Sequence, residues 1–213
     1  MSDGSLWGFG NNAYNAFAPG LQNYRPSPVK IDSNVTQMSA GYNTSMWVKT
    51  DGSLWGIGQN EQGQLGDGTI ATKTQPTRIL LNGVKKVVTS IGKETLILMT
   101  DGTLWGTGGN SFGELGLGFV SVTPAFVTSP KQLPGISGVK DMGIGNGVGY
   151  FIKTDNTYWT MGYHGNGGLG LPGDTIITAP TNLAVLDGAS VLNYTITSGL
   201  ANFVGKSDGS LFV

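Results

Sequence analysis

The stretch Asp51-Gly-Ser-Leu-Trp-Gly-Ile-Gly-Gln-Asn60 decides the fold, because it recurs along the chain. Near copies begin at Asp3 and Asp101, a worn copy begins at Asp155, and a short final copy begins at Asp208. The copies follow one another about every 50 residues, a period typical of β-propeller blades and too long for a parallel β-helix. The repeat therefore indicates the architecture before any single strand is assigned.

The residues of one unit predict four strands. Residues 84–90 and 95–100 are rich in β-branched and aliphatic side chains, and residues 104–108 follow an Asp-Gly pair. We expect Asp101-Gly102 to form a two-residue hairpin turn, because glycine readily adopts a positive φ. A Gly-rich loop comes next, and residues 130–133 supply a short fourth strand at a sheet edge, where proline is tolerated.

We therefore predict an all-β fold, a β-propeller built from four-stranded antiparallel blades, with about four repeat units in the chain. The units span approximately residues 3–50, 51–100, 101–154 and 155–207, residues 208–213 begin a fifth, and all of them belong to one domain, 1–213. The 36 glycines among 213 residues exclude a helical bundle, because each glycine inside a helix costs about 1 kcal/mol relative to alanine.

Composition narrows the functional classes. Twelve basic and thirteen acidic residues leave a net charge of −1, and an isoelectric point of about 5.7 argues against a nucleic-acid binder. The chain has no cysteine, which excludes disulfides, thiol nucleophiles and cysteine-based zinc sites. No signal peptide and no long apolar segment are visible. We therefore expect a protein made in the cytoplasm, without membrane insertion.

The repeat resembles the regulator-of-chromosome-condensation repeat family, including its bacterial and phage branch. The resemblance rests on Leu-Trp-Gly-x-Gly-x-Asn, followed in the second unit by the loop Gly63-Gln-Leu-Gly-Asp-Gly68, a proline and an apolar strand. The second and third units match best. The first unit carries residues 12–20 in place of the Gly-rich loop, and the fourth keeps 167–170 but lacks the glycine after Trp159.

The resemblance implies a ring of about seven blades, which is more than four units can supply. Three alternatives follow: a piece of a longer propeller, association with copies of itself, or a ring of four blades. Within one chain, the N-terminal segment could complete the blade begun by residues 191–207 and fasten a ring. Otherwise, these ends are open sheet edges that invite a partner chain.

Several residue types with possible chemistry are better explained as structural. Four tryptophans share one repeat position: Trp7, Trp55, Trp105 and Trp159. The repetition favours packing between blades over the stacking of a ligand, and we expect the neighbouring glycine to make room for each indole ring. Trp47 lies outside that register and is also expected in the core. The Gly-rich loops lack a following helix and are predicted as tight turns rather than phosphate cradles. The turn aspartates stand too far apart to form a calcium loop.

The residues predicted to bind a partner lie mainly in the first unit. Tyr14, Phe17, Tyr24 and Arg25 replace the Gly-rich loop of the sister units, and tyrosine and arginine are enriched at interface hot spots. The alternative is that this loop folds back over the open end of the sheet. The apolar stretch 119–127 allows the same two interpretations. His164, the only histidine, is a further candidate for partner binding.

These observations favour a non-enzymatic structural or binding propeller, with no catalytic, cofactor-binding or metal-binding residues assigned. The partners expected are other proteins or copies of the chain, with a cell-surface glycan as a further candidate, and not nucleic acid. A phage virion component, such as a tail, fibre or decoration protein, is the leading interpretation. The alternative is a regulatory propeller that acts as a guanine-nucleotide exchange factor or an intracellular scaffold. An enzyme would need convergent acids, histidines or metal ligands, and the sequence shows no such group.

Overall fold

The computed structural model describes residues 4–20, 23–121, 126–145, 147–163, 165, 169–171, 175–187, 191–196, 202–206 and 211–212. Of the last three ranges only the backbone is considered. Apart from two 3₁₀ turns, η1 (Ala13–Asn15) and η3 (Ala184–Leu186), the regular elements described are β-strands. The predicted all-β class is therefore confirmed.

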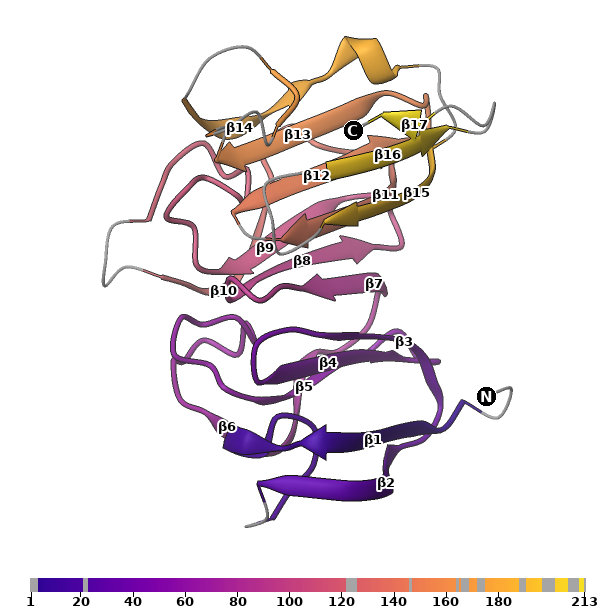
Figure 1. The fold of residues 1–213 in the computed structure, drawn as a ribbon, viewed down its shortest axis with the longest axis vertical. Coiled ribbons are helices and arrows are strands. Elements are labelled where there is room, and N and C mark those ends of the chain that lie inside the picture. Colours follow the sequence, from indigo (N-terminus) through magenta and orange to yellow (C-terminus); the bar gives the residue numbers. More distant parts are fainter. Residues whose placement is uncertain are drawn as a thin grey trace.

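Three complete blades follow one another along the chain (Figure 1). The first contains β3 (Val35–Ala40), β4 (Thr44–Lys49), β5 (Leu54–Gly58) and β6 (Lys73–Leu80). The second contains β7 (Val84–Thr89), β8 (Glu94–Met99), β9 (Leu104–Gly108) and β10 (Val127–Gln132). The third contains β11 (Val139–Gly145), β12 (Val148–Lys153), β13 (Tyr158–Tyr163) and β14 (Ile176–Asn182). Each is a four-stranded antiparallel sheet whose strands lie in sequence order, so the predicted propeller blades are confirmed.

The two ends of the described chain form partial blades. β1 (Leu6–Asn11) and β2 (Tyr24–Asp32) pair with each other, and β15 (Val191–Ile196), β16 (Asn202–Lys206) and β17 (Leu211–Phe212) form another sheet. The motif places β1 and β2 at the third and fourth strand positions of a blade, and β15–β17 at the first three. In Figure 1, β1 and β2 lie at the bottom and β15–β17 near the top. The strand exchange within one chain that would fasten a ring is therefore not formed by the described strands.

In the complete blades, the hairpin turn before the tryptophan strand is longer than predicted. The Met99 N–H donates to the Thr103 carbonyl at 3.0 Å, and the Gly102 N–H donates to the Met99 carbonyl at 3.1 Å. Gly102 has a φ of +80°. These bonds define a three-residue loop, a turn that ends on a left-handed glycine, instead of a two-residue turn. The Asp-Gly pair still identifies the turn in the sequence, because the residue with left-handed backbone favours glycine.

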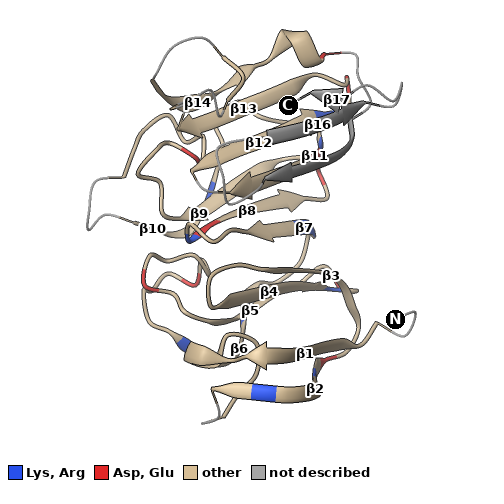
Figure 2. Cartoon of the chain, in the orientation of Figure 1, with Lys and Arg blue, Asp and Glu red and all other residues tan. Residues whose placement is uncertain are grey.

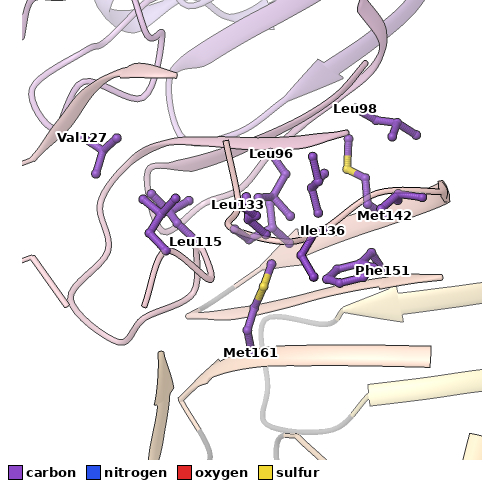
Figure 3. Close-up of a cluster of buried hydrophobic side chains, with 13 residues drawn as sticks. Leu96, Leu98, Leu115, Val127, Leu133, Ile136, Met142, Phe151 and Met161 are labelled. Carbon is purple, nitrogen blue, oxygen red and sulfur yellow. The ribbon is translucent and has the colours of Figure 1, made fainter. Parts of the chain in front are cut away.

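Hydrophobic cores lie between neighbouring blades rather than within one sheet. One cluster joins the second and third blades and includes Leu96, Leu115, Phe151 and Met161 (Figure 3). The equivalent cluster between the first and second blades contains Met46, Val48, Leu54, Leu65, Val84, Val87 and Ile97. The predicted core position of Trp47 is confirmed, because its side chain is fully buried.

The glycine after the blade tryptophan makes room for a leucine and not for the indole ring. A Cβ on Gly106 would lie 3.1 Å from Leu115, and one on Gly56 would lie 2.7 Å from Leu65. Trp105 is half-buried against the core between blades. The predicted packing of the tryptophan between blades is therefore confirmed for Trp105. The prediction that the neighbouring glycine makes room for the indole ring is wrong.

Charged side chains are sparse on the ribbon (Figure 2). Among the described residues, three ion pairs connect neighbouring sheets: Lys49 on β4 with Asp32 on β2 at 2.9 Å, Lys86 on β7 with Asp141 on β11 at 2.5 Å, and Lys93 with Glu61. In the described part of the chain, no helix is long and apolar enough to cross a membrane.

Candidate functional site

In the three complete blades, the hairpin turn contains a hydrogen-bonded chain from aspartate to tryptophan. The Asp101 carboxylate accepts from the Thr103 backbone N–H at 2.9 Å and from its hydroxyl at 2.7 Å. The Trp105 Nε1–H then donates to the Thr103 hydroxyl at 3.0 Å. The bonds from Thr103 hold the pKa of Asp101 below its usual value. The same chain joins Asp51, Ser53 and Trp55, and again Asp155, Thr157 and Trp159.

These aspartates therefore orient the turn and the indole ring. Sequence reasoning assigned them to turns but missed their link to tryptophan, although the spacing Asp-x-Ser/Thr-x-Trp carries the signal. Within the residues described, no group of three or more His, Cys, Asp or Glu side chains is placed to hold a metal ion.

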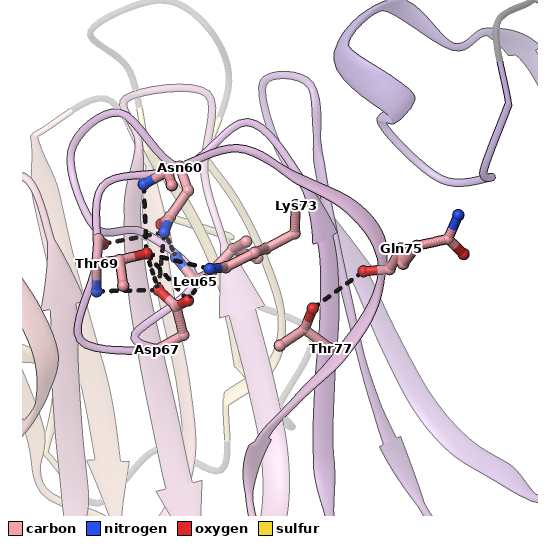
Figure 4. A network of polar contacts seen from close by, with 8 residues as sticks. Asn60, Leu65, Asp67, Thr69, Lys73, Gln75 and Thr77 are labelled. Atoms are coloured by element: carbon pink, nitrogen blue, oxygen red, sulfur yellow. Dashed lines mark hydrogen bonds and ion pairs between the residues drawn. The ribbon is translucent and has the colours of Figure 1, made fainter.

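The Gly-rich loops are anchored by the asparagine that ends the motif (Figure 4). Asn60 Oδ1 accepts from the Leu65 N–H at 2.9 Å, while its Nδ2 donates to Asp67 at 2.9 Å and to the Thr69 carbonyl at 3.0 Å. Lys73 forms an ion pair with Asp67. In the second blade, Asn110 accepts from the Leu115 N–H at 3.0 Å in the same way. The loop amides are thus used within tight turns, as the sequence predicted.

The loop of the first unit follows the same plan with different residues. Asn12 Oδ1 accepts from the Phe17 N–H at 3.2 Å, five residues later, as Asn60 does for Leu65. The Phe17 ring occupies the leucine position, because a Cβ on Gly8 would lie 2.6 Å from it. Phe17 therefore packs over its own blade, which is the alternative considered for this loop.

Of the other residues predicted to bind a partner, one is held by a hydrogen bond within the chain and two are exposed. The Arg25 guanidinium donates to the Pro19 carbonyl at 2.7 Å and ties β2 to the loop. Tyr14 and Tyr24 are exposed. His164 lies outside the described residues, as does part of the 119–127 stretch. Partner binding by these side chains stays a prediction.

Three apolar side chains form what we call the end surface: Trp7 and Phe9 on β1, and Met38 on the neighbouring strand β3. Their exposed fractions are 43%, 70% and 49%. The sister positions of Phe9 in the complete blades are fully buried: Ile57, Thr107 and Met161. Those of Met38 are also fully buried: Val87 and Met142. All three end-surface residues line a cleft of about 230 Å³, together with Phe17, Ile31, Ala40 and Trp47.

The complete blades show what normally covers these positions. Val87 on β7 packs against the preceding blade, where its N–H donates to Gln37 Oε1 at 2.9 Å and its carbonyl accepts from Gln37 Nε2 at 2.9 Å. The Thr107 hydroxyl donates to the Gly63 carbonyl, in the Gly-rich loop of the preceding blade, at 2.9 Å. Met38 is exposed because the sheet β1–β2 lacks the inner strands that cover its sister residues. Phe9 is exposed because none of the described strands forms a blade on the other side of the sheet β1–β2.

A pair of buried acids distinguishes the second blade from the first. Glu94 is fully buried at the start of β8, and Glu114 is buried in the Gly-rich loop. The first blade has Thr44 and Gln64 there, whose side chains contact at 3.5 Å. Burial raises the pKa of Glu94, and burial together with the Glu94 charge raises the pKa of Glu114 to about 7. Glu94 Oε2 has no hydrogen-bond partner among the described residues.

Comparison with family models identifies the repeat. Residues 51–92 match the model of the regulator of chromosome condensation (RCC1) repeat, and residues 35–64 match a second model of the same repeat. The chain carries RCC1 repeats. Comparison with curated proteins found no match.

Solved structures share the fold of this chain. Human WBSCR16 is 20% identical, with a TM-score of 0.81 over 100% of this chain and 57% of its own. Yeast RCC1 (Prp20) in complex with Kap60 is 20% identical, with a TM-score of 0.73 over 84% of this chain and 44% of its own. Prp20p from Saccharomyces cerevisiae gives the same identity and TM-score over 84% and 46%. The chain thus spans about half the length of these structures, and at this identity the likeness shows the fold alone.

Sequence reasoning missed two features of the RCC1 blades. The acid pair had a visible signal, because aligning the repeats places Glu94 and Glu114 where the first blade has Thr44 and Gln64. The sequence indicates the end surface only in part. Phe9 stands at a recognisable repeat position, but its exposure depends on which strands lie beside it in space.

Proposed function

We propose that this chain is a protein-binding module of RCC1 blades that acts by presenting a surface rather than by catalysis. The end surface carries the proposal. Phe9 is 70% exposed although every sister position in the complete blades is buried, and large exposed apolar patches mark interaction sites. Aromatic side chains and methionine are also enriched at the centres of protein interfaces.

The dimensions of the cleft support a protein partner over a small molecule. Its volume of about 230 Å³ lies below the ~300–1,000 Å³ of typical small-molecule sites. Solved relatives include Kap60 bound to yeast RCC1 (Prp20), and Prp20p with its binding properties to Gsp1p and histones. Those partners belong to those proteins, and they support the class of function proposed.

The finer assignments stay predictions. A phage virion component, a glycan-binding surface, a nucleotide exchange factor and an intracellular scaffold would all use a rigid blade array, and the described residues contain no feature that separates them. An acceleration of nucleotide release from a small GTPase would favour the regulatory alternative, whereas recovery of the chain in purified virions would favour the virion assignment.

A photo-crosslinking amino acid tests the binding proposal in cells. Placed at Phe9, it should form adducts with another polypeptide. Leu81, in the connection between β6 and β7, has the same exposed fraction of 70% and is the matched control position. Adducts that are no more abundant from position 9 than from position 81 would overturn the assignment of the end surface.

A further inference from the structure

We propose that the aromatic side chains of Phe112 and Tyr163, together with the buried acids Glu94 and Glu114, form a second binding surface, which accepts an arginine or lysine side chain of a partner protein. The four residues belong to complete blades and lie where the second blade meets the third. The inference goes beyond the proposed function, because this surface consists of other residues than the end surface and specifies the chemistry of what it binds.

The two aromatic rings contact each other and are accessible. The centroids of the Phe112 and Tyr163 rings are 5.2 Å apart, and the ring planes are inclined by 48°. The exposed fractions of the two side chains are 44% and 38%. Gly165 packs against the Tyr163 ring, because a Cβ at Gly165 would lie 2.1 Å from it. The pair therefore offers ring surface to a cation, which aromatic rings attract within about 6 Å of their centroids.

The two buried carboxylates are bonded to the backbone next to these rings. Glu114 Oε2 accepts from the N–H of Phe112 itself at 2.7 Å. Glu94 Oε1 accepts from the Gly147 N–H at 3.3 Å, and a Cβ on Gly147 would lie 3.0 Å from the Phe112 ring. The negative charge of either acid would therefore lie close to a cation held against the Phe112 ring.

The chain itself supplies no counter-charge to these acids. Among the described residues, neither Glu94 nor Glu114 has an ion-pair partner, and Glu94 Oε2 has no hydrogen-bond partner. The neighbouring Lys93 pairs with Glu61 instead. A buried carboxylate without a counter-charge is costly, so a cation supplied by a partner would stabilise the ionised acids and gain affinity from them.

The sister interface, between the first and second blades, has neither feature. Its two aromatic positions hold Gln62 and Gly109, where a Cβ on Gly109 would lie 2.5 Å from Gln62 Oε1. Its two acid positions hold Thr44 and Gln64. Neutral polar residues are therefore sufficient for packing one blade on the next. Rings and acids replace them together at one interface, and such departures from a structural repeat are expected at functional sites.

Fluorescence anisotropy with short labelled peptides tests the class of ligand on the purified full chain. A peptide of alternating arginine and glycine should bind, and the corresponding glutamate peptide should not. Glu114→Gln should weaken binding of the arginine peptide about tenfold, because it removes a charge next to the rings. Gln64 makes the same turn bond in the first blade, so the variant should stay folded, which its thermal unfolding midpoint checks.

Asp101→Asn is the control for net charge. It removes the same charge at the hairpin turn, which lies at the opposite end of β8 from Glu94, and should change the affinity by less than about twofold, because salt screens distant charges. Equal weakening by Glu114→Gln and Asp101→Asn would mean general charge attraction and would contradict the proposed site.

Phe112→Gln tests the aromatic contribution, because it introduces the residue of the first blade. It should weaken binding of the arginine peptide about fivefold. Phe119→Gln is the matched control: Phe119 is 42% exposed, and its ring already faces a cation of this chain, Lys131, with Nζ 5.6 Å from the centroid. Its affinity should equal that of the wild type, and equal losses in the two variants would count against the aromatic pair.

Two results with the wild type would overturn the inference. One is the absence of binding to the arginine peptide. The other is equally tight binding of a peptide of alternating leucine and glycine, which would show an apolar occupant. Neither result affects the Phe9 adducts in cells, which decide the proposed function independently.

Discussion

Replacing Glu114 by glutamine should stabilise the fold, and increasingly so as the pH rises. The change imitates the first blade, where Gln64 occupies the same loop position. The turn bond survives in principle, because Glu114 Oε2 accepts from the Phe112 N–H at 2.7 Å and Gln64 Oε1 accepts from the Gln62 N–H at 3.0 Å. By analogy with Gln64 and Thr44, the new amide would face Glu94, whose Oε2 has no partner in the described structure.

The size of the effect follows from the raised pKa. Burial and the Glu94 charge raise the pKa of Glu114 from 4.5 to about 7. A carboxyl group with a raised folded pKa favours folding below its unfolded pKa, and this contribution is lost as pH rises through the folded value. The wild type should therefore lose about 2.5 kcal/mol of unfolding free energy between about pH 5 and pH 8. For a chain of this size, that is a fall of roughly 5–10 °C in the unfolding midpoint.

Thermal unfolding followed by circular dichroism measures this effect at both pH values. The midpoint of Glu114→Gln should exceed that of the wild type clearly at about pH 8 and much less at about pH 5. Glu61→Gln is the control, because the bond from Lys93 lowers the pKa of Glu61 and keeps its titration below this window. Burial also raises the pKa of Glu94, so the titration of Glu94 lowers the unfolding free energy of both the wild type and the variant as the pH rises. Equal differences between wild type and Glu114→Gln at the two pH values would refute the reasoning.

Three further substitutions, one of them paired with a control, test the packing by the same thermal measurement. Phe17→Ala should lower the free energy of unfolding by about 2 kcal/mol, because it removes the ring that fills the leucine position. Tyr14→Ser, at an exposed position, should change it by less than about 0.5 kcal/mol. Equal effects of the two substitutions would contradict the division of this loop into a packed part and an exposed part. Asn60→Ala should cost about 2 kcal/mol through the unpaired amide of Leu65, and an unchanged midpoint would show that the anchor is dispensable. Gln37→Ala should cost about 1 kcal/mol, because it breaks both bonds to Val87 between blades; a neutral result would argue against that contact.

The strands could be predicted because their signals are local. The strand before the Asp-Gly turn, the tryptophan strand and the Gly-rich loop each follow from side chains a few residues apart, and the second blade matches the predicted strands closely. The hairpin length was wrong because Asp-Gly suits both two-residue and three-residue loops. Only the hydrogen bonds of Met99 distinguish them.

Candidate site residues were harder to predict, because exposure depends on residues distant in sequence. For Phe17 the sequence left two interpretations open, partner binding or cover over the open end of the sheet, and its place five residues after Asn12 makes it the counterpart of Leu65. The sequence does not single out Phe9, because Phe9 occupies an ordinary strand position of the repeat. Its exposure depends on the neighbouring blade, which no local pattern records.

The sequence by itself determined the blade: its strands, the position of its turn, its Gly-rich loop and its resemblance to the RCC1 repeat. These depend on short-range periodicity and on glycine at fixed positions, so they repeat wherever the motif repeats. Only the tertiary structure decided which copies of the motif are covered. The cores lie between blades, and therefore the same residue position is buried at Val87 and exposed at Met38. That difference in packing partners leaves Phe9 and Met38 exposed at one end of the described blades.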